Sequence, residues 1–135
     1  MKKIGVLTGG GDCPGLNAFI RAVVKSAVFR HNLEVVGILD GYTGLVEGLS
    51  RPLFPDDVSG VLAWGGTLLG TSHTANPFRY AERDAKGVST ARDRSQEVLR
   101  VIEKLQLDGL VIAGGDGTLS SALKLSQMGV PLVGA

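Results

Sequence analysis

The sequence predicts an α/β fold: a mostly parallel, doubly wound β-sheet with helices on both faces. Short apolar runs alternate along the chain with longer segments whose apolar residues recur every three or four positions, as expected for strands that alternate with helices. Glycine-rich turns directly follow two of the apolar runs, at Gly9 and Gly114. Because ligands of such sheets bind beyond the carboxyl ends of the strands, we expect these turns and a third glycine-rich loop at Gly65 to converge on one side.

The first part of the chain predicts two strands and the helix between them. Residues 4–8 form a continuous apolar run, which is typical of a buried parallel strand. Residues 16–30 predict a helix because their apolar side chains recur at helical spacing. Residues 34–39 predict the second strand, and the glycines of residues 40–45 predict a loop.

The middle of the chain is expected to be less regular. Residues 56–64 predict a short helix that begins at Asp56 or Asp57 and places Trp64 in the core. Residues 80–94 are rich in charged side chains, and we expect a mobile surface loop there.

The last part of the chain returns to a regular alternation. Residues 95–105 predict a helix with Ser95 as its cap, and residues 109–113 predict a buried strand. A helix over residues 118–128 and a strand over residues 131–134 are expected to follow.

Composition narrows the class of protein. The 135 residues suffice for one domain, and a net charge of +1 gives no electrostatic reason to expect nucleic acid or a membrane surface as a partner. Residues 58–70 are uncharged and mostly apolar, but they contain four glycines and are shorter than the roughly 20 residues of a membrane span. The single cysteine, Cys13, cannot form an internal disulfide, which suits a reducing compartment. We therefore expect a cytoplasmic protein.

The turn at residues 114–118, GGDGT, has the features of a phosphate site. Glycines let the backbone approach a ligand closely, and the free N–H groups of a helix's first turn favour an anion. A carboxylate in that setting, Asp116, is explained if Mg²⁺ lies between it and a phosphate. The alternative is an ordinary strand-to-helix turn in which Asp116 or Thr118 caps the helix.

Two other segments add possible phosphate contacts. Three glycines after the first strand can wrap an anion with their amides. The loop over residues 65–79 carries hydroxyl, imidazole and guanidinium donors, although serine and threonine are also ordinary turn formers and a lone histidine is more often structural. The donors of this loop are Thr71, Ser72, His73, Thr74 and Arg79.

Three further side chains each have two interpretations. Tyr42, between glycines, either stacks on a planar ligand ring or anchors its loop as a half-buried residue. Arg21 and Lys25 lie four residues apart on the outer face of their helix, where they form either a solvated basic face or a contact for an anionic effector.

Four blocks of the sequence closely resemble the 6-phosphofructokinases. The chain lacks the G-x-x-x-x-G-K-[ST] loop and the G-x-G-x-x-G fingerprint, so neither a P-loop NTPase nor a dinucleotide dehydrogenase is indicated. The resemblance is collinear and covers the whole chain. Its blocks are TGGGDCPGLNA (8–18), DGYTGL (40–45), GGTLLG (65–70) and GGDGT (114–118). The last block alone also resembles lipid and nucleotide kinases, but the first block argues against them.

The resemblance implies phosphoryl transfer to the 1-hydroxyl of fructose 6-phosphate, with Mg²⁺. By position, it places Asp116 on the Mg²⁺ and Tyr42 near the adenine. His73 stands where the family usually has an arginine that contacts the transferring phosphate, and Arg79 is the alternative donor. The residues expected around the donor phosphates are Gly10, Gly11, Thr74, Gly115, Gly117 and Thr118.

The resemblance also bears on regulation and assembly. Arg21 and Lys25 are similar to the basic positions that line the effector site in allosteric bacterial members, although Lys25 stands where those members often have arginine. A complete enzyme is expected to be a homotetramer that acts on fructose 6-phosphate and ATP.

The identity of the donor and the extent of the chain raise separate questions. Gly117 is the residue that ATP-using members of the family have, where pyrophosphate users tend to have an aspartate that would repel the α-phosphate region of ATP, so the resemblance favours ATP. The sequence of residues 13–18 and 76–78 also resembles branches that contain pyrophosphate users. We interpret residues 1–135 as a donor-binding α/β domain that is incomplete at its C-terminus. The family's Thr-Ile-Asp-Asn-Asp block, which supplies the catalytic base, is not in the sequence. We therefore expect this polypeptide alone to have little or no kinase activity, and a non-catalytic nucleotide-binding role is the alternative.

Overall fold

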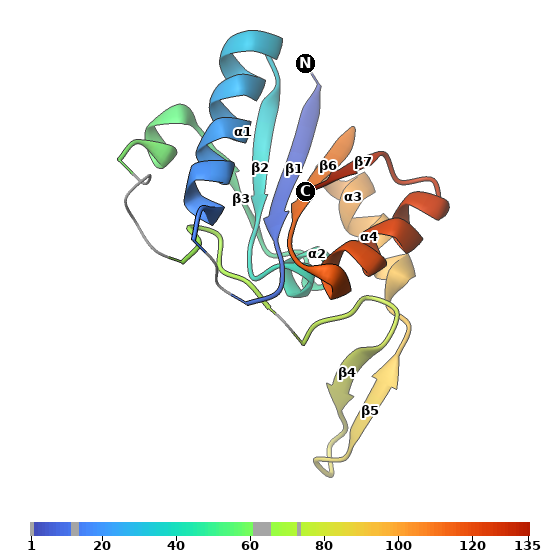
Figure 1. Cartoon of the computed structure of the whole chain (residues 1–135). Coiled ribbons are helices and arrows are strands. Elements are labelled where there is room, and N and C mark those ends of the chain that lie inside the picture. Colours follow the sequence, from blue (N-terminus) through green and yellow to red (C-terminus); the bar gives the residue numbers. More distant parts are fainter. Residues whose placement is uncertain (1, 12–13, 61–65, 73) are drawn as a thin grey trace.

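A five-stranded sheet forms the centre of the computed structural model, which describes residues 2–11, 14–60, 66–72 and 74–135 (Figure 1). The strand order is β3-β2-β1-β6-β7. The pairs β1·β2, β1·β6 and β6·β7 are parallel, and β3 runs antiparallel to β2 at one edge. The strands are β1 (Lys3–Thr8), β2 (Glu34–Ile38), β3 (Ser50–Leu53), β6 (Gly109–Ala113) and β7 (Leu132–Gly134).

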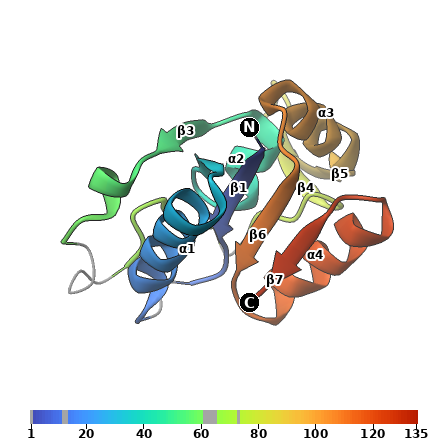
Figure 2. The same cartoon turned by 90° about the horizontal axis from the view of Figure 1, so that it is seen from above.

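Helices cover both faces, so the predicted fold class is confirmed. Helix α1 (Leu16–His31) and the 3₁₀ turn η1 (Pro55–Val58) pack on one face, while α2 (Tyr42–Glu47), α3 (Ser95–Leu105) and α4 (Asp116–Gln127) pack on the other. Figure 2 shows α1 and α3 on opposite sides of the sheet. Neighbouring strand residues alternate between the two cores, because successive side chains of a strand point to opposite faces: Val6 belongs to the first core and Leu7 to the second.

The structure corrects two of the expected loops. Helix α2 begins at Tyr42, inside the segment that its glycines predicted to be a loop; Gly44 is required there because a Cβ would lie 2.0 Å from the Leu39 carbonyl oxygen. The charged segment 80–94 contains a β-hairpin, β4 (Tyr80–Arg83) paired with β5 (Ser89–Arg92), rather than a mobile loop. The carboxylate of Asp84 closes the hairpin turn by accepting the N–H groups of Lys86 and Val88.

Smaller differences concern element ends. Where the helix over residues 56–64 was expected, the described residues up to 60 contain the 3₁₀ turn η1; residues 61–64, with Trp64, lie outside the described residues. Strand β3 was not expected. Asp93, not Ser95, provides the side-chain cap at the start of α3, because its carboxylate accepts the Ser95 N–H at 2.8 Å. Within the described ranges, no helix has both the length and the apolar character needed to cross a membrane.

Candidate functional site: the glycine turns at the ends of β1 and β6

The strand order reverses at β1. The chain leaves β1 through α1 to reach β2 on one side, whereas β6 pairs with β1 on the other side. In open α/β sheets this reversal opens a crevice beyond the carboxyl ends of the two strands, and ligands bind there. The turns that leave β1 and β6 begin at that place, and the Gly9 N–H donates to the Ala113 carbonyl oxygen at 2.8 Å.

Thr118 joins the two turns. Its side chain is buried between Gly9 and Gly114, where a Cβ on either glycine would lie 2.6 Å from an atom of the threonine. Real Cβ atoms do not approach other atoms so closely, so both positions need glycine for this contact to form. The contact sets the first turn of α4 directly against the turn that follows β1.

The third glycine-rich loop reaches the same edge through residues 66–72. The Thr8 hydroxyl lies 2.9 Å from the Thr67 hydroxyl oxygen and donates to the Gly70 carbonyl at 3.0 Å. The Gly10 N–H donates to the Ser72 carbonyl at 3.2 Å. The predicted convergence is therefore observed for the described part of all three segments; Gly65 and His73 lie outside the described residues.

A pocket of about 290 Å³ lies where the three segments meet. Among the described residues, its wall consists of glycine backbone, the methyl group of Ala75, four hydroxyl side chains and one amide, with no charged side chain. The amides at the N-terminus of α4 have no acceptor within the helix and favour an anionic group. The lining residues are Gly10, Ser72, Thr74, Ala75, Asn76, Gly115, Gly117, Thr118 and Ser121.

A second hollow, of about 490 Å³, shares Gly10 and Gly115 with the first. Gly11 and the start of α1 also line it, together with the end of β6 and Ala135. The two shared glycines therefore contribute to the walls of both hollows. This arrangement allows a phosphate chain held in one hollow to be approached from the other.

The structure brings together most of the residues predicted to hold a donor, but not all of them. Gly10, Thr74, Gly115, Gly117 and Thr118 line the first pocket and Gly11 lines the second hollow. The exposed side chain of Arg79 lines neither of them.

Tyr42 does not present its ring at the surface, which favours the interpretation of this residue as an anchor over stacking on a ligand ring. The residue is 1% exposed and packs in the core beneath α4. Its hydroxyl donates to the Thr118 carbonyl oxygen at 2.6 Å, and burial raises the pKa of this phenol. Tyr42 therefore anchors the first turn of α4 from below, and its burial is more complete than the alternative of a half-buried anchor assumed.

Asp116 is accessible to a metal ion beside the first pocket, although it is not among the described lining residues of either hollow. Its carboxylate is exposed and lies between two glycines, Gly115 and Gly117, at which even an added Cβ would meet nothing within 4 Å. Among the described residues there is no group of three or more metal-ligating side chains. Mg²⁺ commonly uses one or two carboxylates plus substrate phosphates and waters, so a single accessible carboxylate beside a phosphate pocket fits this ion.

Arg21 and Lys25 lie on α1 and line neither hollow. The Nε atom of Arg21 is buried without a hydrogen-bond partner among the described residues. Lys25 borders a separate surface hollow together with Arg30. The structure places these two residues away from the glycine turns.

Sequence reasoning missed part of the pocket. Ser121 follows Gly117 by four residues and Thr118 by three, and this helical spacing could have placed it on the same face of α4. Asn76 could have been found from its position before Pro77, where its side chain organises the turn by accepting the Phe78 N–H at 2.9 Å.

Comparison with known proteins identifies the family. The phosphofructokinase family model matches residues 3–135. The chain belongs to the phosphofructokinase family. It is 46% identical, over 134 residues, to an ATP-dependent 6-phosphofructokinase of Clostridium perfringens, covering 99% of this chain and 37% of that protein. It is 44% identical, over 132 residues, to a pyrophosphate–fructose 6-phosphate 1-phosphotransferase of Amycolatopsis methanolica, covering 98% of this chain and 35% of that protein.

A solved structure confirms the fold of this phosphofructokinase chain. The phosphofructokinase of Pichia pastoris in its T-state superposes with a TM-score of 0.79 at 34% identity, over 98% of this chain and 13% of that one. The chain thus spans little more than a third of the length of the curated relatives it matches. Those relatives are named as enzymes, so the family is an enzyme family.

Proposed function

We propose that this chain binds the phosphoryl donor of a 6-phosphofructokinase, that the donor is ATP with Mg²⁺, and that the complete protein phosphorylates fructose 6-phosphate. The observation that carries the proposal is the meeting of two glycine turns and a helix N-terminus in an uncharged pocket at the strand reversal. The membership of the chain in the phosphofructokinase family supports it.

The backbone does most of the binding in this proposal. The amides near Gly10 and Gly115 contact the donor phosphates, and the hydroxyls of Thr118 and Ser121 complete the polar wall. Asp116 holds the Mg²⁺, which when bound neutralises charge on the phosphate oxygens. No covalent chemistry is asked of these residues, because phosphoryl transfer depends mainly on positioning and electrostatic stabilisation.

Gly117 supports ATP over pyrophosphate. It lines the pocket, and a Cβ added there would meet nothing within 4 Å. A side chain at this position would therefore affect the binding of the ligand and leave the packing of the fold unchanged. An aspartate would place a negative charge where the longer phosphate chain of ATP passes. The curated relatives include proteins named for each donor, so the preference for ATP rests on the lining of the pocket.

We propose that the 135-residue polypeptide binds the donor without turning it over. Neither hollow is lined by a carboxylate among the described residues, so no general base is assigned to the sugar hydroxyl. The family resemblance supports a cytoplasmic homotetramer for the complete protein. A coupled assay with fructose 6-phosphate that showed normal turnover by this polypeptide would contradict the proposal that it binds the donor without turning it over.

Calorimetric titration of the chain with Mg·ATP and with Mg·pyrophosphate tests the donor. We expect binding of Mg·ATP, and Gly117→Asp should weaken it about tenfold or more while affecting pyrophosphate less. Ser120→Asp is the matched control, because it adds the same charge to an exposed position of α4. If both variants lost the same affinity for Mg·ATP, the added net charge alone would explain the loss. If the unaltered chain did not bind ATP, the proposal would be rejected.

A further inference from the structure

The hairpin β4–β5 extends away from the sheet and is joined to the molecule at its base (Figure 1). It follows directly in the chain after the segment that we call the pocket wall, the lining residues Ser72, Thr74, Ala75 and Asn76. A two-stranded hairpin is only marginally stable by itself, so its contacts with the body decide how it is held. Those contacts lie beside the pocket wall, and the function described above does not use them.

The pocket wall is attached at both ends. At its start, Ser72 accepts the Gly10 N–H at 3.2 Å. Just after its end, the Pro77 carbonyl accepts the Arg94 N–H at 2.7 Å. Between them the wall is braced by its own bonds, because Ala75 donates to the Ser72 hydroxyl at 3.1 Å. One end of the wall is therefore tied to Arg94 through Pro77, in addition to the bond at Gly10 and the packing of Ala75 against the core.

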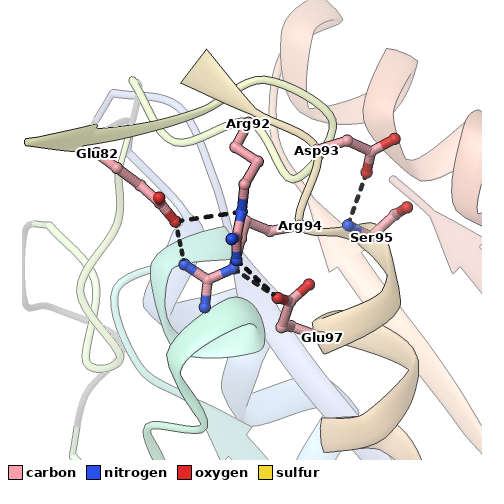
Figure 3. A network of polar contacts seen from close by, with 6 residues as sticks. All are labelled: Glu82, Arg92, Asp93, Arg94, Ser95 and Glu97. Carbon is pink, nitrogen blue, oxygen red and sulfur yellow. Dashed lines mark hydrogen bonds and ion pairs between the residues drawn. The ribbon is translucent and has the colours of Figure 1, made fainter. Parts of the chain in front are cut away.

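Arg94 is held by acidic side chains from two elements (Figure 3). Its guanidinium donates to Glu82 of β4 and its Nε lies 3.0 Å from Glu97 of α3. Arg92 closes the cluster, with an Nη2 atom 3.0 Å from Glu97 and its Nε 3.8 Å from Glu82. The Arg94 side chain is 17% exposed, and it also lies over the Tyr80 ring at 5.5 Å from the ring centre.

These contacts form a network, not an isolated surface pair. The hydrogen bond that Arg94 donates to the Glu82 carboxylate raises the pKa of Arg94, and the negative charges of Glu97 and Glu82 add to this effect. Next to it, the Asp93 carboxylate accepts the first N–H of α3 at 2.8 Å. The hairpin therefore cannot shift relative to α3 without separating charges at a partly buried site, and any shift would be passed to Pro77 through the Arg94 amide.

We propose that Glu82, Arg94 and Glu97 are positioning residues for the donor pocket. They fix the hairpin base on α3 and so hold the pocket wall at the distance from the first turn of α4 that a phosphate group needs. None of the three lines the pocket. They act through the backbone between residues 76 and 94. This inference rests on the proposed function, because it assumes that the pocket takes a phosphate ligand.

The substitution Glu82→Ala separates positioning from simple electrostatics. Removing a carboxylate makes the chain more positive, so an electrostatic effect alone would strengthen the binding of an anion. Positioning predicts the opposite, a rise in the Kd for Mg·pyrophosphate and Mg·ATP of about 5- to 10-fold, because small misplacements of contact groups are costly. Glu82→Gln, which has the same charge change but keeps an acceptor for Arg94, should lose less. Glu103→Ala, at an exposed site of α3, is the control for charge.

Binding is measured well below the unfolding temperature of each variant, together with amide hydrogen exchange of the unliganded chain. We expect faster exchange at Ala75 and at Phe78, whose N–H groups belong to the wall's own bonds. Unchanged or tighter binding by Glu82→Ala would overturn the inference and leave the proposed function intact. If the unaltered chain bound neither ligand, the proposed function would fail, and unchanged exchange at Ala75 would then overturn the positioning role as well.

Discussion

The donor pocket and the base of the hairpin lie next to each other and are built in opposite ways. In the part of the chain that the structure describes, the pocket is lined by glycines, one alanine, hydroxyls and one amide, without a charged side chain. The hairpin base gathers Glu82, Arg92, Arg94 and Glu97 into one network of ion pairs. The comparison teaches that the four charged side chains of the hairpin base are engaged with one another, so among the described lining residues an anion in the pocket meets backbone amides and hydroxyls and not these charges.

The two regions also differ in how they respond to change. A backbone site depends on how closely chain segments approach, so added atoms should harm it and altered charge should matter less. A charged network depends on its partners and on screening by salt. Substitutions in each region can test this difference.

The largest effect is expected from Gly9→Ala. The new Cβ would lie 2.6 Å from Thr118, which is buried, so the turn after β1 and the first turn of α4 must separate. We expect the free energy of unfolding, measured with urea, to fall by about 2–3 kcal/mol. Gly115→Ala is the matched control, since a Cβ there meets nothing within 4 Å, and it should be nearly neutral. Similar losses in the two variants would show that close approach does not build this pocket.

The next effect concerns the metal. Asp116→Asn should lower the affinity for ATP about tenfold when Mg²⁺ is present, because the carboxylate that holds the ion is lost. With the metal removed by a chelator, the same variant should bind ATP more tightly than the unaltered chain, since a negative charge has left an anion site. Asp56→Asn, an exposed acidic position in η1, is the control. A loss of equal size with and without Mg²⁺ would argue against a metal ligand.

A smaller effect is expected from Tyr42→Phe. It deletes the hydroxyl that donates to the Thr118 carbonyl oxygen, and the loss of this buried hydrogen bond should cost about 1 kcal/mol at neutral pH. Burial raises the pKa of Tyr42 above its ordinary value of about 10, so its stabilising contribution is complete below that pH and is lost as the pH rises further.

Urea unfolding at neutral pH and above about pH 10 measures both consequences of that change. The unaltered chain should lose more stability at alkaline pH than Tyr42→Phe does. ATP affinity should change little, because the buried ring offers no surface for stacking. A large loss of ATP affinity with pyrophosphate affinity preserved would instead support an adenine contact.

The sequence was sufficient for those parts of the molecule whose signals are local. The parallel strands and the helices α1, α3 and α4 follow from apolar periodicity, and residues 109–113 and 95–105 were predicted with their exact ends. Glycines after apolar runs also located the pocket edge. Helix α2 was missed because Gly44 weakens the helical pattern, while the reason for that glycine is a close contact with the backbone of Leu39. No local rule contains a contact of that kind.

The hairpin and the role of Tyr42 were missed for a related reason. The charges of residues 80–94 resemble those of a solvated loop, and only the partners of Glu82 and Arg94 on other elements show that they are used in folding. Tyr42 lies 76 residues from the carbonyl it contacts, so its neighbours in the sequence could not distinguish an exposed ring from a buried one. Periodicity identifies the elements, whereas long-range contacts decide what an irregular segment does.

The smallest effect is expected from Arg92→Gln, which tests whether the exposed ion pairs of the hairpin network contribute less to stability than the partly buried ones. The side chain of Arg92 is 59% exposed, against 17% for Arg94, although both contact Glu82 and Glu97. Water and salt screen exposed pairs, so the substitution should lower the Tm by no more than about 2 °C, and the loss should vanish in high salt. Arg94→Gln should cost more, and its cost should persist in salt because the Arg94 side chain itself is less accessible to water and ions. Thermal unfolding of the two variants at low and high ionic strength makes the measurement. If both variants lost the same Tm and both losses vanished in high salt, the network would be an ordinary surface cluster. The hairpin base would then differ from the pocket only in its location.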